Sequence, residues 1–205
     1  MTTLAHAAGA PAAVARIGPN AITRVAEALL REISAERTQQ IFATAGLAHY
    51  LRQPPEAMVD EEEVIRLHRA LDGALGDTTA RRIARVAGLA TGDYLLARRI
   101  PQAVQAILKR LPARIAARIL LIAIRKHAWT FAGSGRFSAA AGRPVQLAIA
   151  TNPLCRGVAA TVPHCDYYAA TFERLFRVLV HADATVVETA CESCGAAACR
   201  FEIRW

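Results

Sequence analysis

The hydrophobic and polar residues of this chain follow two different periods. From residue 20 to about residue 126, apolar side chains recur every three to four positions, as in α-helices with one buried face. Toward the end of the chain the period shortens to two, which is typical of strands with one buried and one solvated face. The pattern therefore predicts a helical N-terminal half followed by a mainly antiparallel sheet, an α+β fold.

Capping residues and prolines divide the helical half. Residues 1–15 are low-complexity Ala, Gly and Pro, so we expect a disordered tail there. Asp60 and Glu63 have the spacing of a capping box, which starts a helix at about residue 61. Pro101 and Pro112 stand where helices commonly begin. The predicted helices begin at about residues 20, 34, 61, 77, 101 and 112.

Residues 129–205 predict strands interrupted by one long helix. Trp129 and Phe131 indicate a first strand, which the turn Gly133-Ser134-Gly135 joins to a second strand around Phe137. Residues 145–150 and 185–190 form two more alternating or apolar runs, and residues 199–204 form the last. A helix with one apolar face lies at about residues 168–180. The predicted order is β-β-β-α-β-β.

Composition excludes several classes of protein. Of the 205 residues, 54% are hydrophobic, but the most apolar run has only the six residues 119–124, and a membrane span needs about 20. The net charge is +8, yet the basic residues are spread along the helices, so we expect no nucleic-acid partner. We expect a cytoplasmic protein with at most peripheral contact with the inner or photosynthetic membrane.

The cysteines carry the strongest chemical signal. All five lie in the last 51 residues, and an odd number of clustered thiols in a reducing cytosol favours metal or redox chemistry over a disulfide framework. Cys191 and Cys199 flank a hairpin loop, and Cys165 begins the long helix, so their sulfurs can converge. Thiolates that converge on one point suit Zn²⁺.

Other interpretations of the cysteines stay open. Cys191 and Cys194 have the spacing of a redox pair, although such pairs usually begin a helix rather than lie in a hairpin. Simple packing of small apolar side chains is a further alternative. We interpret Cys155 in that way, as a small residue in a loop or packed site and outside the metal set.

The C-terminal motif resembles the vinyl-4-reductase domain family, which also supplies the ligand-sensing domain of aromatic-responsive transcription activators. The resemblance covers roughly the last two thirds of the chain, so residues 61–205 are predicted to form the domain and residues 16–60 a helical extension. The motif consists of Cys165, Glu188-x-x-Cys191, Gly195 and Cys199-x-Phe201-x-Ile203.

The resemblance implies a zinc site formed by Cys165, Glu188, Cys191 and Cys199, with Cys194 as the alternate for Glu188. With four protein ligands the zinc is structural and holds the C-terminal hairpin to the long helix. In a regular strand, residues 188 and 191 point to opposite faces, so we expect a bulge before Cys191.

Residues 152–157 and 165–176 are similar to the branch of this family that acts in bacteriochlorophyll biosynthesis as 4-vinyl reductases. This resemblance implies reduction of the vinyl group of a divinyl chlorophyllide or protochlorophyllide. The residues show no nicotinamide, flavin or iron–sulfur motif, so direct binding of NADPH is not expected. We therefore interpret the chain as a carrier or accessory factor that binds a tetrapyrrole. Two alternatives are a genuine vinyl reductase with an external electron donor and a small-molecule sensor or interaction module.

Candidate tetrapyrrole ligands are fewer and less specific. Three histidines are candidates for the central Mg²⁺ or a propionate, two aromatic residues for the pocket wall, and two arginines for a propionate. Expected partners are a Mg-porphyrin intermediate, enzymes of Mg-porphyrin synthesis and a second copy of the chain. The candidate residues are His127, His164, His181, Trp129, Phe131, Arg98 and Arg99.

Overall fold

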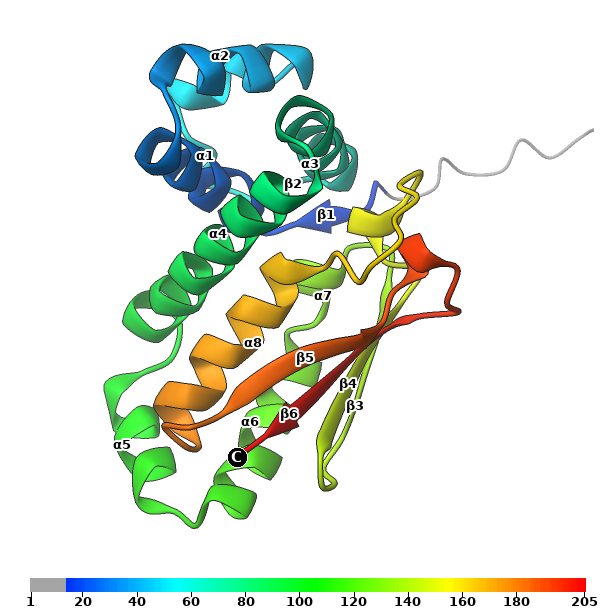
Figure 1. The fold of residues 1–205 in the computed structure, drawn as a ribbon. Coiled ribbons are helices and arrows are strands. Elements are labelled where there is room, and N and C mark those ends of the chain that lie inside the picture. Colours follow the sequence, from blue (N-terminus) through cyan, green and yellow to red (C-terminus); the bar gives the residue numbers. More distant parts are fainter. Residues whose placement is uncertain (1–13) are drawn as a thin grey trace, which may run out of the picture.

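The computed structural model describes residues 14–205, so the predicted tail lies almost entirely outside the described residues. Three helices cluster at one end of the molecule, at the top of Figure 1, where the long helix α4 begins. A two-stranded ribbon, β1 (Arg16–Ile17) with β2 (Val59–Asp60), lies beside them. The clustered helices are α1 (Asn20–Glu32), α2 (Ala35–Thr44) and α3 (Glu61–Leu75), and α4 spans Asp77–Arg98.

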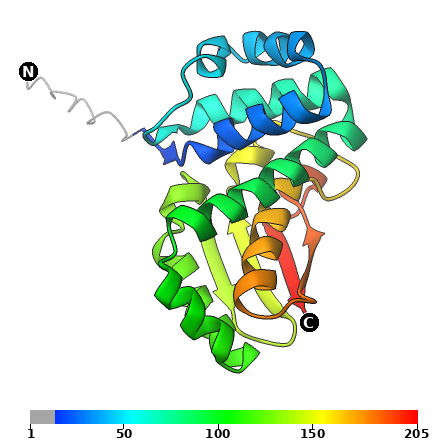
Figure 2. The same cartoon turned by 90° about the vertical axis from the view of Figure 1, so that its left-hand side faces the viewer.

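A four-stranded antiparallel sheet forms the C-terminal half, in the order β3-β4-β6-β5. Helix α8 (Asp166–Leu179) covers one face of this sheet, and α4 packs along α8 on its far side (Figures 1 and 2). The α+β class with a helical N-terminal half is thus confirmed. The strands are β3 (Arg136–Ala140), β4 (Val145–Ala150), β5 (Thr185–Ala190) and β6 (Cys199–Arg204).

Two predicted elements differ from the structure. The expected first strand is instead the helical turn α7 (Trp129–Ala132), because backbone bonds from Thr130 and Ala132 return to residues 127 and 128. Gly133, with φ of 55°, ends this turn, so the sheet has four strands and not five. The second predicted helix stops at Thr44, where Gly46 adopts φ of 73°, and continues only as the 3-10 turn η1 (Ala48–Leu51).

Helices α5 (Gln102–Arg110) and α6 (Ala113–Lys126) connect α4 to the sheet. Each begins directly after its predicted proline, which supplies a fixed φ and needs no hydrogen-bonded N–H. The buried face of α6 rests on α8 and β3. Within residues 14–205, every helix is too short or too polar to span a lipid bilayer.

The contact between α4 and α8 depends on glycine. A Cβ at Gly88 would lie 2.3 Å from the carbonyl oxygen of Tyr167, which is backbone and has no room to move. We expect Gly88→Ala to destabilise the protein by about 2 kcal/mol or more through overpacking, despite the better helix propensity of alanine. Urea unfolding of both proteins measures this difference.

Gly73 provides the matched control. It is an exposed glycine within α3, and a Cβ there meets no atom within 4 Å. Gly73→Ala is expected to raise the free energy of unfolding by about 0.5–1 kcal/mol. Equal effects of the two substitutions would contradict the close α4–α8 contact.

Candidate metal centre

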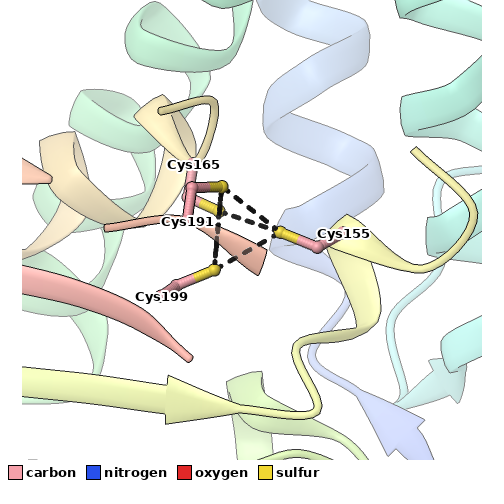
Figure 3. A group of neighbouring side chains, drawn as sticks. All are labelled: Cys155, Cys165, Cys191 and Cys199. Atoms are coloured by element: carbon pink, nitrogen blue, oxygen red, sulfur yellow. Dashed lines mark hydrogen bonds between the residues drawn. The ribbon is translucent and has the colours of Figure 1, made fainter. Parts of the chain in front are cut away.

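Four cysteine sulfurs meet between the start of α8, the last hairpin and the loop after β4. They belong to Cys155, Cys165, Cys191 and Cys199, and all four residues are buried (Figure 3). Cys155 ends the 3-10 turn η2 (Pro153–Cys155), and Cys165 immediately precedes α8. Cys191 follows β5 and Cys199 is the first residue of β6. Three parts of the chain therefore supply one group of thiols.

The sulfurs have the spacing of a tetrahedron. The six Sγ–Sγ distances are 3.4 Å (155–165), 3.7 Å (155–191), 3.4 Å (155–199), 3.9 Å (165–191), 3.5 Å (165–199) and 3.9 Å (191–199). Four thiolates at about 2.3 Å from a tetrahedral zinc ion stand about 3.8 Å apart. The group therefore fits one tetrahedral ion that favours sulfur, such as zinc or iron.

Local backbone conformations bring the sulfurs to this point. The side chain of Asn152 accepts a hydrogen bond from the N–H of Leu154 (3.1 Å) and so caps the turn that presents Cys155. Gly195, with φ of 87°, turns the chain back toward Cys199. The β5–β6 register shifts between Glu188 and Ala190, which confirms the bulge expected before Cys191.

Hydrogen bonds from nitrogen surround the thiols. The Nδ2 of Asn152, a buried side chain, lies 3.2 Å from both Cys165 Sγ and Cys199 Sγ. The backbone N–H of Glu192 points to Cys199 Sγ at 3.4 Å, and the carboxylate of Glu192 accepts from the N–H groups of Thr151 and Asn152. Donors aimed at sulfur favour thiolate over thiol, which is the form that binds metal.

The close contacts also divide the protons unequally among the thiols. Hydrogen bonding to Cys155 lowers the pKa of Cys191 and raises the pKa values of Cys165 and Cys199. Some of the thiols therefore hold protons when no metal is bound. Binding of a metal ion by all four would release those protons, so the affinity would rise with pH.

Glu188 lies beside this group and not within it. Its Oε2 accepts a hydrogen bond from the backbone N–H of Cys165 at 2.7 Å, and its buried Oε1 has no partner among the described residues. Burial, the largest effect, raises the pKa of Glu188 to about 8. The structure thus brings together three of the four predicted ligands, while Glu188 positions the backbone of one of them. Cys194, the predicted alternate, is exposed.

The interpretation that set Cys155 apart from the cluster is wrong in its placement. Its Sγ lies within 3.7 Å of the other three sulfurs and takes the corner expected for Glu188. The signal was the turn Asn152-Pro153, which redirects the chain toward the start of α8 only ten residues later. Metal binding by the cluster remains a prediction.

Replacement of Glu188 distinguishes the two ligand sets. We expect Glu188→Gln to keep the same zinc content per chain and to change stability by less than about 1 kcal/mol, because the amide oxygen still accepts from Cys165 N. Elemental analysis of the purified variant and its thermal unfolding test this. Loss of zinc in this variant would restore Glu188 to the ligand set.

The candidate tetrapyrrole residues lie at separate places in the fold. His127 and Trp129 are exposed near the end of α6, and Phe131 packs edge-on against Phe137 and Phe172 in the core. His181 follows α8 and is exposed. Arg98 and Arg99 are exposed at the end of α4, with the Arg99 guanidinium 5.9 Å from the ring centre of Tyr94.

His164 has a different environment from the other histidines. Its Nε2 lies 3.1 Å from Asp72 and its Nδ1 lies 3.5 Å from Asp77. The hydrogen bond with Asp72, the largest effect, raises the pKa of His164 to about 9. A protonated imidazole has no free lone pair, so this state does not favour His164 as a ligand of Mg²⁺.

A small cavity between α3, α4 and α8 borders His164. Its volume is about 10 Å³, which is room for roughly one water molecule, and His68, Arg81 and Tyr167 also line it. His68 is fully enclosed, and burial lowers its pKa to about 4, so it is neutral at physiological pH. A tetrapyrrole does not fit this cavity in the conformation described.

The family model of the vinyl-4-reductase domain matches residues 145–205, the part of the chain that holds all four clustered cysteines. This is the class of domain that the hairpin motif resembles. The match leaves the predicted domain start at residue 61 as a prediction.

Two curated relatives extend the match to almost the whole chain. One, from Cereibacter sphaeroides, is 46% identical over 95% of this chain and 93% of its own length. Another, from Rhodobacter capsulatus, is 42% identical over 91% of this chain and 85% of its own length. Both are named bacteriochlorophyll synthase 23 kDa chain. The chain belongs to the family of these 23 kDa chains.

Solved structures show the same fold at low sequence identity. A crystal structure described as an Fe(II) unliganded H-NOX protein mutant from K. algicida has a TM-score of 0.60 at 12% identity, over 92% of this chain and 96% of that one. A second structure, described by the modulation of heme redox potential through porphyrin distortion, has a TM-score of 0.50 at 12% identity, over 92% of this chain and all of that one. These likenesses show the fold alone.

Proposed function

We propose that this chain acts in bacteriochlorophyll biosynthesis, where it binds a tetrapyrrole intermediate and carries or presents it. The observation that carries the proposal is the 46% identity to a bacteriochlorophyll synthase 23 kDa chain over nearly the full length of both proteins. Similarity of that extent covers the helical half as well as the vinyl-4-reductase domain, so it supports a shared role and not only a shared module.

The cysteine cluster supports a structural metal within this function. Four thiols at tetrahedral spacing leave no open coordination position for a substrate or water. Zinc in this site would hold η2, the start of α8 and the C-terminal hairpin together, and its binding free energy would add to that of folding. The carrier role needs no reaction at this site.

A macrocycle is compatible with this architecture. One structure with the same fold is described in terms of a porphyrin that its protein distorts, although the 12% identity carries no information about individual residues. The small cavity beside His164 is too small for such a ligand. Binding would therefore require a separation of helices or a site on the surface, and it should alter the protection of backbone amides where the ring binds.

Titration of the zinc-loaded protein with divinyl protochlorophyllide tests the proposal, with and without NADPH. Absorbance measures binding, and chromatography of the extracted pigment measures loss of the vinyl group. The carrier predicts micromolar or tighter binding with the vinyl group intact in both arms. Titration of the same pigment-free protein with an unrelated aromatic dye provides the control for unspecific adsorption.

Two results would overturn the carrier. Vinyl reduction that depends on NADPH would establish a reductase, the principal alternative. No saturable binding of divinyl protochlorophyllide, or equal binding of the dye, would remove tetrapyrrole binding and favour an interaction module.

A further inference from the structure

Acidic residues are missing from a long central part of the chain. Residues 94–165 contain eleven Arg and Lys residues and no Asp or Glu. The whole chain has a net charge of +8, so the residues outside this segment have a net charge of −3. The positive charge is thus a property of one segment and not of the composition in general.

Helices α5 and α6 form the part of this segment that reaches farthest from the N-terminal helices (Figure 1). They contain six basic residues, and among residues 14–205 no ion pair involves any of these six. The positive charge of these helices is therefore not neutralised within the protein. The six residues are Lys109, Arg110, Arg114, Arg118, Arg125 and Lys126.

Apolar side chains are exposed on the same two helices. On α6, Ile115, Ile119 and Ile122 are 45%, 41% and 65% exposed. Their spacing of four and three residues places them in one row along the helix, while the opposite side of α6 is buried against α8 and β3. On α5, Val104 and Ile107 are 42% and 58% exposed. Exposed apolar rows of this kind mark interaction surfaces.

The combination favours a lipid surface over a second copy of the chain. A two-fold interface would bring two sets of unpaired positive charges together, and this repulsion opposes association. An anionic bilayer instead offers phosphates to the arginines and an acyl boundary to the isoleucines, which is how amphipathic helices lie in a membrane interface. We propose that α5 and α6 form a peripheral docking surface for an anionic lipid bilayer.

Vesicle sedimentation tests the charge. The full chain is mixed with vesicles of phosphatidylcholine alone or with roughly one third phosphatidylglycerol, at low and high salt. We expect binding only to the anionic vesicles and loss of binding at high salt. Arg114→Gln/Arg118→Gln should weaken binding about 25-fold, because each basic residue near an anionic surface contributes about fivefold. The control Arg31→Gln/Arg52→Gln removes two exposed arginines outside the two helices and should retain binding.

A second pair of variants tests the apolar row. Ile122→Gln should reduce binding to the anionic vesicles several-fold, whereas Leu30→Gln, at a 53% exposed position on α1, should not. All these substitutions are at exposed positions, so circular dichroism should show unchanged folding for each.

Three results would overturn the proposal. The first is no binding to anionic vesicles at low salt. The second is equal weakening by the Arg31/Arg52 control, which would indicate an unspecific charge effect. The third is a dimer in sedimentation velocity that Ile122→Gln dissociates, which would make this face an interface between copies. None of these experiments contains pigment, so their outcome is separate from that of the proposed function.

Discussion

Replacement of Cys155 by serine is expected to abolish stoichiometric zinc binding. Cys155 supplies three of the six short Sγ–Sγ distances, so its loss leaves three thiols and an open corner. Because metal binding in such a site adds to folding free energy, the free energy of unfolding should fall by at least about 3 kcal/mol, which lowers Tm by roughly 6–12 °C in a chain of this size. Elemental analysis and thermal unfolding measure the two effects.

Cys194→Ser is the matched control, since Cys194 lies in the same hairpin but is exposed. It should keep its zinc and its Tm. Zinc retained by Cys155→Ser but lost from Glu188→Gln would contradict the four-thiol site and support the ligand set that the family resemblance implies. Addition of a strong chelator to the unaltered protein should lower Tm as Cys155→Ser does, because both remove the same ion.

Replacement of Glu61 by glutamine is expected to cost about 2–4 kcal/mol. Glu61 is 5% exposed, and its carboxylate accepts from Ser134 N (2.7 Å), Ser134 Oγ (2.8 Å) and Arg156 Nη2 (3.0 Å). These bonds join the start of α3 to the turn before β3 and to the loop that follows Cys155. An amide in this place presents a donor to donors, so at least one buried group loses its partner.

The effect of Glu61 should depend on pH in a defined direction. Burial by itself would raise the pKa of Glu61, but hydrogen bonds from Ser134 and Arg156 outweigh it and hold the pKa below its ordinary value. A lowered folded-state pKa gives stability that is present above the unfolded pKa of about 4.3 and is lost as the pH falls through the folded value. The difference between the wild type and Glu61→Gln should therefore be constant near neutral pH and shrink below about pH 4.

Glu62→Gln is the control for this prediction. Glu62 pairs with the same arginine, Arg156 Nη1, at 2.6 Å, but its side chain is 52% exposed. Exposed pairs contribute little, so its replacement should cost less than about 1 kcal/mol. Urea unfolding of the three proteins from pH 7 to about pH 3 separates the two carboxylates, and equal losses would contradict a buried role for Glu61.

The sequence predicted the elements whose period or end residues are unambiguous. Strand β4 and strand β5 were predicted at their observed residues because their apolar runs are bounded by turn residues, and α5 and α6 begin directly after their prolines. Trp129 and Phe131 misled because aromatic residues two apart favour a strand, whereas the short turn α7 is fixed by tertiary contacts such as the bond from Gly18 N to Thr130 O.

The candidate site was predictable only in part for a physical reason. Cys191 and Cys199 belong to one hairpin and Cys165 to the helix start, so local motifs indicate them. The position of Cys155 depends on contacts distant in sequence, namely the carboxylate of Glu192 on the backbone of Asn152 and the guanidinium of Arg69 on the carbonyl of Arg156. No local pattern encodes such contacts, so periodicity and spacing left Cys155 outside.

The uneven distribution of charge has a consequence for motion as well as for binding. The basic segment includes α5 and α6 at one end of the molecule, while the first turn of α3 at the other end holds Glu61, Glu62 and Glu63 (Figure 1). A body with such separated charges has an electric dipole and experiences a torque in the field of an anionic surface. It would rotate before contact and arrive with α5 and α6 foremost. Ionic strength should therefore slow the encounter itself, in addition to shortening the time that the protein stays bound.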